Sequence, residues 1–388
     1  MMELKTIFET IEKPVSGEWG IEPSKGSIIK VLRNTNFSND GSLNLKDVVE
    51  REISISKIAQ KKLNYGDILI EKSGGSPAQP VGRVVFFDQT EGEYLFSNFT
   101  SLLRPKKGIF PKYLFYLLYG NHLFKKTLSY QNKTTGILNL QLEKYLKETK
   151  IPIPSLTDQQ CITTILDHAD SIRRKNRQIL EKYNELAQSV FYEMFGDPVR
   201  NEKGWPYFEL KTLGKISTGS TPSSSKSDMF GGNIPFVTPG DLDLDIPYKR
   251  FVTIAGSKHS RIVTEGALFV CCIGATIGKT RMAKEICAFN QQINAVQWNT
   301  LVTPLFGLNA FRFVKREVIN KAISTTLPIL KKSEFEKIKM AVPPINIQNR
   351  FSEIILDIEK QKELTQKSLE KSEDLFQSLL QRAFKGEL

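Results

Sequence analysis

Residues 274–280, Gly-Ala-Thr-Ile-Gly-Lys-Thr, have the composition of a phosphate-binding loop, which would make the protein an ATPase or GTPase. Phosphate-binding loops have the spacing G-x-x-x-x-G-K-[ST], because four intervening residues wrap backbone N–H groups around the phosphates. Only three residues separate Gly274 from Gly278, and the first half of the chain has no corresponding segment. We therefore expect a strand–turn–strand rather than a nucleotide site, with Thr276, Lys279 and Arg281 facing solvent or phosphate.

Residue types that bind metals or act as nucleophiles are scattered along the chain. The three histidines are far apart in the sequence (His122, His168 and His259), and no H-E-x-x-H segment occurs. The four cysteines form no C-x-x-C pair, so we expect reduced core thiols (Cys161, Cys271, Cys272 and Cys287). We find no complete catalytic constellation, and we expect neither a catalytic site nor a metal site in this chain.

Charge is the strongest signal in the composition. The 388 residues include 54 Lys and Arg against 42 Asp and Glu, which gives a formal net charge of +12. Such an excess favours a polyanionic partner, most often nucleic acid, although solubility alone accounts for a modest excess. No signal peptide and no apolar run of membrane-spanning length are visible, so we expect a cytoplasmic protein without membrane contact.

The second half of the chain resembles the first. Four short segments recur in the same order, at separations between 189 and 206 residues. The pairs are residues 3–6 and 209–212 (ELKT in both), 66–69 and 266–269, 154–159 and 343–348, and 165–167 and 355–357. This period is far too long for a solenoid, so the sequence predicts a duplicated domain.

Each half has the same internal order. Short β-type runs separated by Gly, Ser, Pro and Thr come first, and a proline-containing exit then leads into a long segment with helical periodicity. The sequence therefore predicts an α+β fold. The predicted domains are residues 1–155 and 199–344, and the predicted long helices are residues 156–198 and 345–388.

The first long helix carries a heptad seam, in which core positions alternate at spacings of three and four. Its positions are Ile162, Ile165, Ala169, Ile172, Asn176, Ile179, Tyr183, Leu186 and Val190. The second helix repeats the pattern at Phe351, Ile355, Ile358, Leu369, Phe376, Leu379 and Ala383, with Lys362, Thr365 and Ser372 interrupting it. Because neither helix can bury its stripe alone, we predict that they pack on each other; the alternative is that each packs on its own domain.

A basic cluster, residues 173–177 (RRKNR), lies in the middle of the first helix. It is either a solvated face or a contact for phosphate or an acidic partner. The residues near the helix ends, Phe195, Leu379 and Phe384, either meet partner subunits or close a core against the opposite domain.

The order of several motifs is specific. The second half contains GWPYFELKTLG (204–214), TGSTP (218–222), GGNIPFV (231–237) and FNQQ (289–292), and residues 379–388 read LLQRAFKGEL. With the P-x-[LI]-x-x-Q exits at Pro154 and Pro343, these motifs resemble the DNA-specificity subunits of type I restriction–modification enzymes. The first half departs from the pattern: it has no obvious G-x-T-P-S run, and only Ser97-Asn98 corresponds to residues 289–292.

The resemblance implies two target-recognition domains of mixed, mainly β character. They would be separated by two long antiparallel, coiled-coil-like helices in a pseudo-two-fold tandem repeat. The chain would be a non-catalytic subunit that reads a bipartite, asymmetric site in double-stranded DNA. Modification and restriction subunits would be its partners and would bind S-adenosylmethionine, ATP and Mg. The alternative function is a helical adaptor or scaffold whose basic charge is incidental.

Within each domain we expect phosphate contacts from Lys and Arg and base contacts from mixed polar side chains on loops. The candidates in the first domain are Lys72, Ser73, Arg83, Lys133, Thr134 and Thr135. Those in the second domain are Ser220, Thr221, Thr276, Lys279, Gln291, Gln292, Thr325, Thr326 and Lys331. Each is otherwise an ordinary polar loop residue, and the two glutamines suit either adenine edges or the capping of strands.

Overall fold

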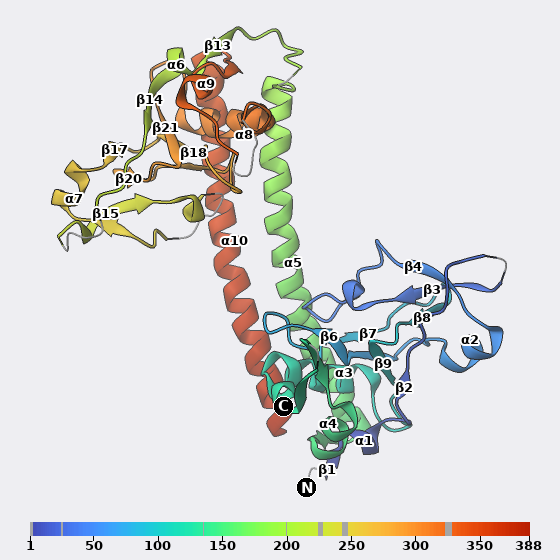
Figure 1. Cartoon of the computed structure of the whole chain (residues 1–388). Helices are drawn as coiled ribbons and strands as arrows, with labels where there is room; N and C mark the ends of the chain where they lie inside the picture. The colour runs from blue at the N-terminus through green and yellow to red at the C-terminus, as the bar shows by residue number, and fades with distance from the viewer. Residues whose placement is uncertain are drawn as a thin grey trace. The chain divides into compact units, whose positions relative to one another are not determined.

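The computed structural model describes residues 3–24, 26–134, 136–198, 200–223, 228–242, 247–322 and 328–388. The chain divides into two compact units, each of which combines a β-rich domain with part of each of two long helices (Figure 1). Unit 1 contains Met1–Arg177 and Lys367–Leu388, and unit 2 contains Gln178–Gln366. Helices α5 (Leu156–Phe195) and α10 (Ile345–Lys385) therefore contribute to both units. Among the described residues, no helix is both long and apolar enough to cross a membrane.

The domain of unit 1 is built around an antiparallel sheet in the order β2-β9-β5-β7 (Val15–Ser16, Thr100–Leu103, Ile68–Glu71 and Val84–Phe86). Two further sheets are β4-β3-β8 (Val49–Glu52, Ile28–Leu32 and Tyr94–Phe96) and β10-β11-β6 (Gln131–Thr134, Ile137–Leu140 and Ser73–Gly75). Strand β1 (Glu3–Thr6) pairs with β12 (Lys150–Ile153). The short helices are α1 (Ile7–Thr10), α2 (Ile55–Lys61), α3 (Pro111–Leu123) and α4 (Leu142–Glu148).

The domain of unit 2 has a corresponding sheet in the order β14-β21-β18-β19 (Gly214–Thr218, Ile293–Trp298, Leu268–Cys271 and Thr280–Met282). Its second sheet is β16-β15-β20-β17 (Phe251–Val252, Phe230–Val237, Cys287–Phe289 and Arg261–Val263). Strand β13 (Tyr207–Glu209) pairs with β22 (Lys339–Ala341). The short helices are α6 (Leu210–Leu213), α7 (Ile254–Lys258), α8 (Pro304–Asn320) and α9 (Lys332–Phe335).

The main sheets of the two domains have the same strand order, β2-β9-β5-β7 and β14-β21-β18-β19, which confirms the predicted duplication. Each domain contains a single parallel pair among its described strands, β3 with β8 and β15 with β20. The matching glycines Gly66 and Gly266 both have positive φ, at 92° and 81°, before a central strand. Both donate their backbone N–H across the sheet at 2.9 Å, to Phe87 and Ala283 respectively.

Two of the four sequence echoes are out of register in the structure. ELKT forms strand β1 in unit 1, whereas in unit 2 it ends strand β13 and begins helix α6. The echo of residues 165–167 in 355–357 is shifted by one residue, because buried Ile355 matches buried Leu166, while Ile165 is 38% exposed. Chance similarity of short segments explains both errors.

The exit motif of unit 1 holds helix α5 to its domain through one buried glutamine. Gln159 is 1% exposed. Its Oε1 accepts a hydrogen bond from the N–H of Phe110 at 2.8 Å. Its Nε2 donates to the carbonyls of Gly108 and Pro154, at 3.2 and 3.0 Å.

Unit 2 repeats this arrangement at the start of α10. Gln348 is fully buried, accepts from the N–H of Thr303 at 2.9 Å, and donates to the carbonyls of Leu301 and Pro343. In both units the glutamine thus satisfies three backbone groups and joins the first turn of a long helix to the segment before α3 or α8.

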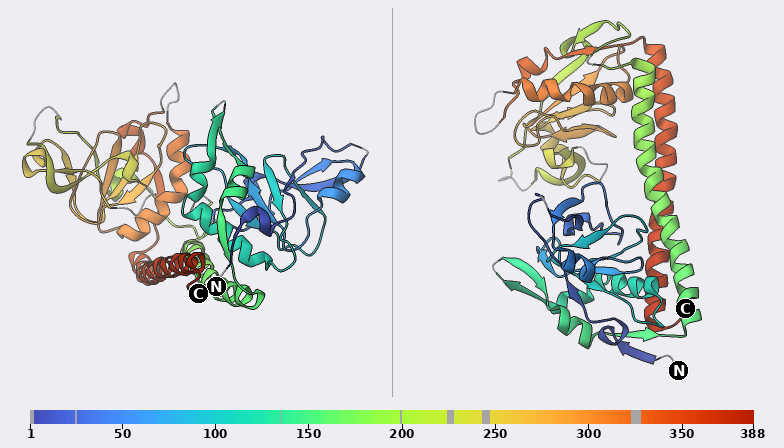
Figure 2. Two further views of the ribbon diagram at one scale, coloured as in Figure 1. Left: turned by 90° about the horizontal axis from the view of Figure 1, so that it is seen from below. Right: turned by 90° about the vertical axis from the view of Figure 1, so that its right-hand side faces the viewer.

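Within each unit, segments of α5 and α10 pack antiparallel, as Figures 1 and 2 show. In unit 1, Asn176 donates from Nδ2 to the hydroxyls of Ser368 and Ser372, both at 3.2 Å. In unit 2, Phe351 packs against Phe191 and Phe195, with ring centroids 5.5 and 5.1 Å apart. The helices therefore pack on each other and also on the domains, so both alternatives raised by the sequence hold.

The buried positions of α10 follow the predicted seam except that Leu380, at 0% exposure, replaces the half-buried Leu379, whereas those of α5 differ more. Phe351, Ile355, Ile358, Phe376 and Ala383 are buried, and Leu369 is half-buried. On α5 the buried positions next to Ile162 and Ala169 are Leu166 and Arg173, at 0% and 2% exposure. The predicted seam residues Ile165, Ile172, Ile179 and Leu186 are 38%, 50%, 40% and 45% exposed. Ile162 and Ala169 are therefore buried as predicted, but Leu166 and Arg173 take the places of Ile165 and Ile172. The arginine can occupy a core position because it is paired.

The three residues near the helix ends pack in or against the hydrophobic cores of the units. Phe195 lies in the core of unit 2, and Leu379 and Phe384 pack against that of unit 1. The ring of Phe384 lies against Gly120 of α3, where a Cβ would come within 2.4 Å of it.

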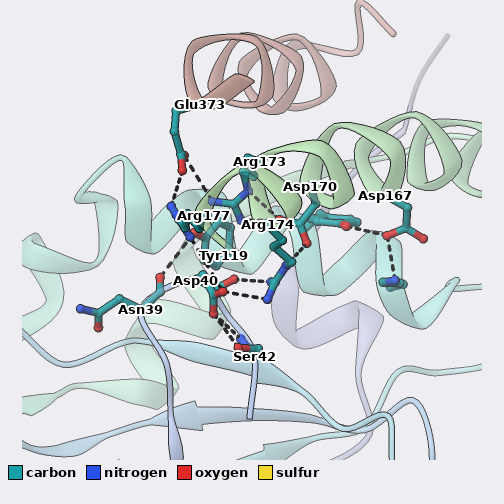
Figure 3. A network of polar contacts seen from close by, with 12 residues as sticks. Asn39, Asp40, Ser42, Tyr119, Asp167, Asp170, Arg173, Arg174, Arg177 and Glu373 are labelled. Atoms are coloured by element: carbon teal, nitrogen blue, oxygen red, sulfur yellow. Dashed lines mark hydrogen bonds and ion pairs between the residues drawn. The ribbon is translucent and has the colours of Figure 1, made fainter. Parts of the chain in front are cut away.

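Arg173 is buried because its charge and its flat face both have partners (Figure 3). The guanidinium carbon lies 4.0 Å from the ring centroid of Phe376. Its Nε donates to Asp170 at 2.6 Å, and Nη1 lies 3.4 Å from a carboxylate oxygen of Glu373 on α10. Arg177 pairs with the same Glu373. A stacked and paired arginine can therefore replace an apolar residue at the helix interface.

Arg174 binds the domain of unit 1 to helix α5 (Figure 3). Its Nη1 and Nη2 donate to the carboxylate and the carbonyl of Asp40, at 2.7 and 2.8 Å. Burial would raise the pKa of Asp40, but hydrogen bonds from Ser42 and the charge of Arg174 outweigh it and lower that pKa. Internal ion pairs therefore account for the three arginines of the basic cluster.

We predict that Gln159→Leu lowers the free energy of unfolding of unit 1 by about 2–3 kcal/mol, because it leaves buried backbone groups without partners. Urea denaturation of the full chain measures the change. Gln160→Leu, on the exposed face of the same turn, is the control and should change stability by no more than about 0.5 kcal/mol. Equal effects of the two variants would contradict this role for Gln159.

Asp40→Asn should lower the stability of unit 1 at neutral pH by about 1–3 kcal/mol, because Arg174 loses its charged partner. A carboxyl group with a lowered pKa stabilises the fold above its unfolded pKa, near 3.8, and loses that contribution as pH falls through its folded pKa. The difference between wild type and variant should therefore shrink below about pH 4. Urea titrations across this range test it, with Asp47→Asn, an 89% exposed carboxyl side chain, as the control. A difference independent of pH would refute the ion-pair explanation.

Candidate nucleic-acid interface

Four strands of the main sheet of unit 2 bring three turns to one edge. Strand pairing aligns Thr218 with Asn294, Cys271 with Ile293 and Val270 with Thr280. The turns 219–223, 272–279 and 290–292 therefore lie together, and we call them the unit 2 loop edge. Six of the candidates predicted from the sequence lie on it: Ser220, Thr221, Thr276, Lys279, Gln291 and Gln292.

The segment GATIGKT is the turn between β18 and β19. Gly274 and Gly278 have positive φ values of 94° and 81°, which favour glycine. The N–H of Ile277 donates to the carbonyl of Gly274, and the N–H of Gly278 donates to that of Cys271. Strand β19 follows the turn, whereas a phosphate-binding loop leads into the N-terminus of a helix. The strand–turn–strand expectation is confirmed.

The three polar side chains of this turn have different environments. The Thr276 hydroxyl lies 3.3 Å from the sulfur of Cys271, and Lys279 is half-buried. Arg281, expected to face solvent or phosphate, is only 8% exposed. Its guanidinium stacks 4.2 Å from the ring centroid of Tyr248 and donates to the carbonyl of Asp241 at 2.9 Å. The expectation for Arg281 is therefore wrong, because stacking and hydrogen bonding hold its guanidinium in the domain.

Two turns of the unit 2 loop edge pack backbone to backbone, and we call residues 219–222 and 290–292 the paired turns of unit 2. The N–H groups of Gly219 and Ser220 donate to the carbonyls of Ile293 and Phe289, both at 3.0 Å. A Cβ at Gly219 would lie 2.1 Å from the carbonyl oxygen of Asn290, so only glycine fits.

Unit 1 has the same paired turns at residues 17–20 and 97–99. The N–H groups of Gly17 and Glu18 donate to the carbonyls of Thr100 and Phe96, at 3.3 and 2.8 Å. A Cβ at Gly17 would again lie 2.1 Å from a carbonyl oxygen, that of Ser97. The sequence reasoning missed residues 17–20, although the glycine after the first strand of the sheet was the available signal.

The paired turns of unit 1 carry other side chains than those of unit 2. The guanidinium carbon of Arg51 lies 4.4 Å from the ring centroid of Trp19. Phe99 is 48% exposed. An open cavity of about 620 Å³ lies beside them and is lined in part by Trp19, Glu52 and Asn98. A cavity lined by both aromatic and polar side chains can accept a flat ligand such as a base.

Lys72 and Ser73 lie on the corresponding edge of unit 1. The Nζ atom of Lys72 donates to the hydroxyl of Ser16 at 2.5 Å, directly beside the paired turns. Burial, and to a smaller extent the charge of Lys61, lowers the pKa of Lys72. The hydroxyl of Ser73 donates to Asn139 of strand β11.

The remaining candidates lie on neighbouring segments or outside the described residues. Lys133 and Thr134 belong to strand β10, which pairs with β11 in the sheet that contains β6. Lys331 is exposed at the start of α9 and follows Leu330, whose N–H donates to the carbonyl of Cys272 on the unit 2 loop edge. Thr135, Thr325 and Thr326 fall outside the described residues.

Arg83 occupies a structural position rather than an exposed one. It is 8% exposed, and its Nε and Nη2 pair with the two carboxylate oxygens of Glu71, at 2.9 and 3.0 Å. Its Nη1 donates to the carbonyl of Phe37 at 2.8 Å. A phosphate contact would have to break this buried ion pair, so Arg83 is removed from the candidates.

Comparison with known proteins identifies the family. The model of the type I restriction modification DNA specificity domain matches residues 2–184 and 202–373. The type I restriction enzyme MjaIX specificity subunit of Methanocaldococcus jannaschii is 27% identical over 317 residues, which cover 73% of this chain and 70% of that protein.

Two solved structures share the fold. The S subunit of a type I restriction–modification system from M. genitalium has a TM-score of 0.60 and 15% identity, covering 99% of this chain and 96% of that one. A chain from a study of complex assembly and conformational transition in a type I system also has a TM-score of 0.60, with 16% identity over 100% of this chain and 98% of the other. With two matches of the family model that together span most of its length, the protein belongs to the family of the type I restriction modification DNA specificity domain.

Proposed function

We propose that this chain is the DNA-recognition subunit of a type I restriction–modification complex. Each domain would read one half of a bipartite target. The observation that carries the proposal is that both domains present the same paired-turn backbone with different side chains. Two pairs of turns with the same backbone but different side chains suit two half-sites of different sequence. The net charge of +12 suits a polyanionic partner.

We infer that the chemistry belongs to partner subunits. In this proposal modification subunits bind S-adenosylmethionine and methylate the site, and restriction subunits bind ATP and Mg to translocate and cleave DNA. This chain supplies recognition and no catalytic residue, and it acts in the cytoplasm, where the DNA is. An adaptor with incidental charge is supported less well, because it gives no reason for two family domains with matched paired turns.

The proposal predicts salt-sensitive, sequence-specific DNA binding. In complex with its modification subunit, the chain should lose about 100-fold or more in affinity for duplex DNA between 50 and 200 mM salt. Mapping of methylated bases in a host that expresses the pair should give one bipartite, asymmetric motif. Methylation without a motif, or binding that salt does not change, would favour the adaptor.

Helix length should set the separation of the half-sites, because α5 and α10 each contribute to both units. Deleting seven residues from each helix keeps the heptad phase and shortens each by about 10 Å, or about 3 base pairs of DNA. Methylation mapping should then show unchanged half-sites with a shorter spacer. Alanine substitution of exposed residues in the same heptads is the control. Altered half-sites with an unchanged spacer would disprove this dependence.

A further inference from the structure

The carbonyl oxygen of Gln291 is held toward the facing turn, and this orientation decides which amide group the side chain has left for a ligand. Its Oε1 is hydrogen-bonded to the hydroxyl of Thr221 across the paired turns. A carbonyl oxygen can only accept, so Thr221 donates this bond. Nε2, which carries two hydrogens and no acceptor, is then the amide group that this exposed side chain has left for a ligand.

Gln292 is oriented in the same way by a different neighbour. Its Oε1 accepts from Nδ2 of Asn290 at 3.2 Å, and its backbone N–H donates to Oδ1 of Asn290 at 3.1 Å. Because a backbone N–H can only donate, this second bond sets Oδ1 of Asn290 as the acceptor and leaves Nδ2 as the donor to Gln292. Two adjacent glutamines therefore have their carbonyl oxygens engaged within the domain.

Base edges in the major groove differ in what they require from such a side chain. Reading adenine takes both amide groups, since Oε1 must accept from N6 while Nε2 donates to N7. Guanine presents two acceptors, O6 and N7, which match the two hydrogens of one Nε2 group. Because the bond from Thr221 holds Oε1 of Gln291 toward the facing turn, Nε2 is the amide group left to meet a base, and this favours guanine over adenine.

We propose that the paired turns of unit 2 read a guanine in the major groove through the Nε2 group of Gln291, with Thr221 as the positioning residue that excludes adenine. Gln292 adds a second donor beside it. The inference rests on the proposed function and deepens it by naming a base and the group that reads it.

The paired turns of unit 1 cannot read a base in this way, although their backbone is the same. The structural counterparts of Thr221, Gln291 and Gln292 are Trp19, Asn98 and Phe99, as the shared backbone hydrogen bonds show. An aromatic ring replaces the hydroxyl that would orient an amide. The guanine contact therefore belongs to one half-site only, and the two half-sites differ.

The test is methylation mapping with the chain and its modification subunit expressed together. Gln291→Glu keeps an acceptor for Thr221 but replaces the two donor hydrogens with a carboxylate oxygen. Thr221→Val removes the orienting hydroxyl at nearly constant volume, whereas Thr221→Ser keeps it. Gln361→Glu, the same substitution at an exposed position of α10 in unit 2, is the control for the added negative charge.

Wild type should require guanine at one position of one half-site. Gln291→Glu should lower the preference for guanine at that position by about tenfold or more and leave the other positions unchanged. Thr221→Val should admit adenine there, because the freed amide can then turn its oxygen outward. Thr221→Ser and Gln361→Glu should keep the wild-type motif.

An unchanged motif in both Gln291→Glu and Thr221→Val would overturn the inference, as would a change at a base other than guanine. If Gln291→Glu abolishes methylation altogether, the comparison of Thr221→Val with Thr221→Ser decides. Absence of any bipartite motif in wild type would instead defeat the proposed function, so the two failures are distinguishable.

Discussion

A close contact between two backbones shapes the recognition surface of both units. At Gly17 and at Gly219, a Cβ would lie 2.1 Å from the carbonyl oxygen of the facing turn, so any other residue would push the turns apart. The same backbone hydrogen bonds then hold each pair of turns to the end of the main sheet. Because glycine and backbone atoms alone build this frame, the side chains on it are free to differ between the domains.

The paired turns can be held in a fixed position only if each domain is firmly attached to its long helices. A buried glutamine does this in each unit by satisfying three backbone groups at the start of the long helix. Unit 1 adds the contact of Arg174 with Asp40, which continues through Asp170 and Arg173 to Glu373 of α10. Within unit 1, the position of the domain on the helix pair is thus fixed by both hydrogen bonds and charge.

The sequence predicted the elements better than the individual partners. The exit glutamine and the duplicated domain were visible because they repeat, and the α10 seam was visible because its buried residues are mostly apolar. The α5 seam was placed one residue too early at Ile165 and Ile172, and Arg173 is buried through partners on α10 that no local pattern reveals. Arg83 was misread for the same reason: Glu71 becomes its partner only when β5 and β7 pair. The paired turns of unit 1 were missed because backbone geometry defines them, while their side chains match no motif.

The central claim is that the paired turns and the loop edges beside them face the DNA in both units. Hydrogen–deuterium exchange of the complex with its modification subunit, with and without a duplex that contains the target, tests this most directly. The account predicts slower exchange on DNA binding in residues 17–20, 72–75 and 97–99, and in residues 219–222, 272–279 and 290–292. Slower exchange confined to surfaces away from these turns, such as β1 in unit 1 and β13 in unit 2, would contradict it.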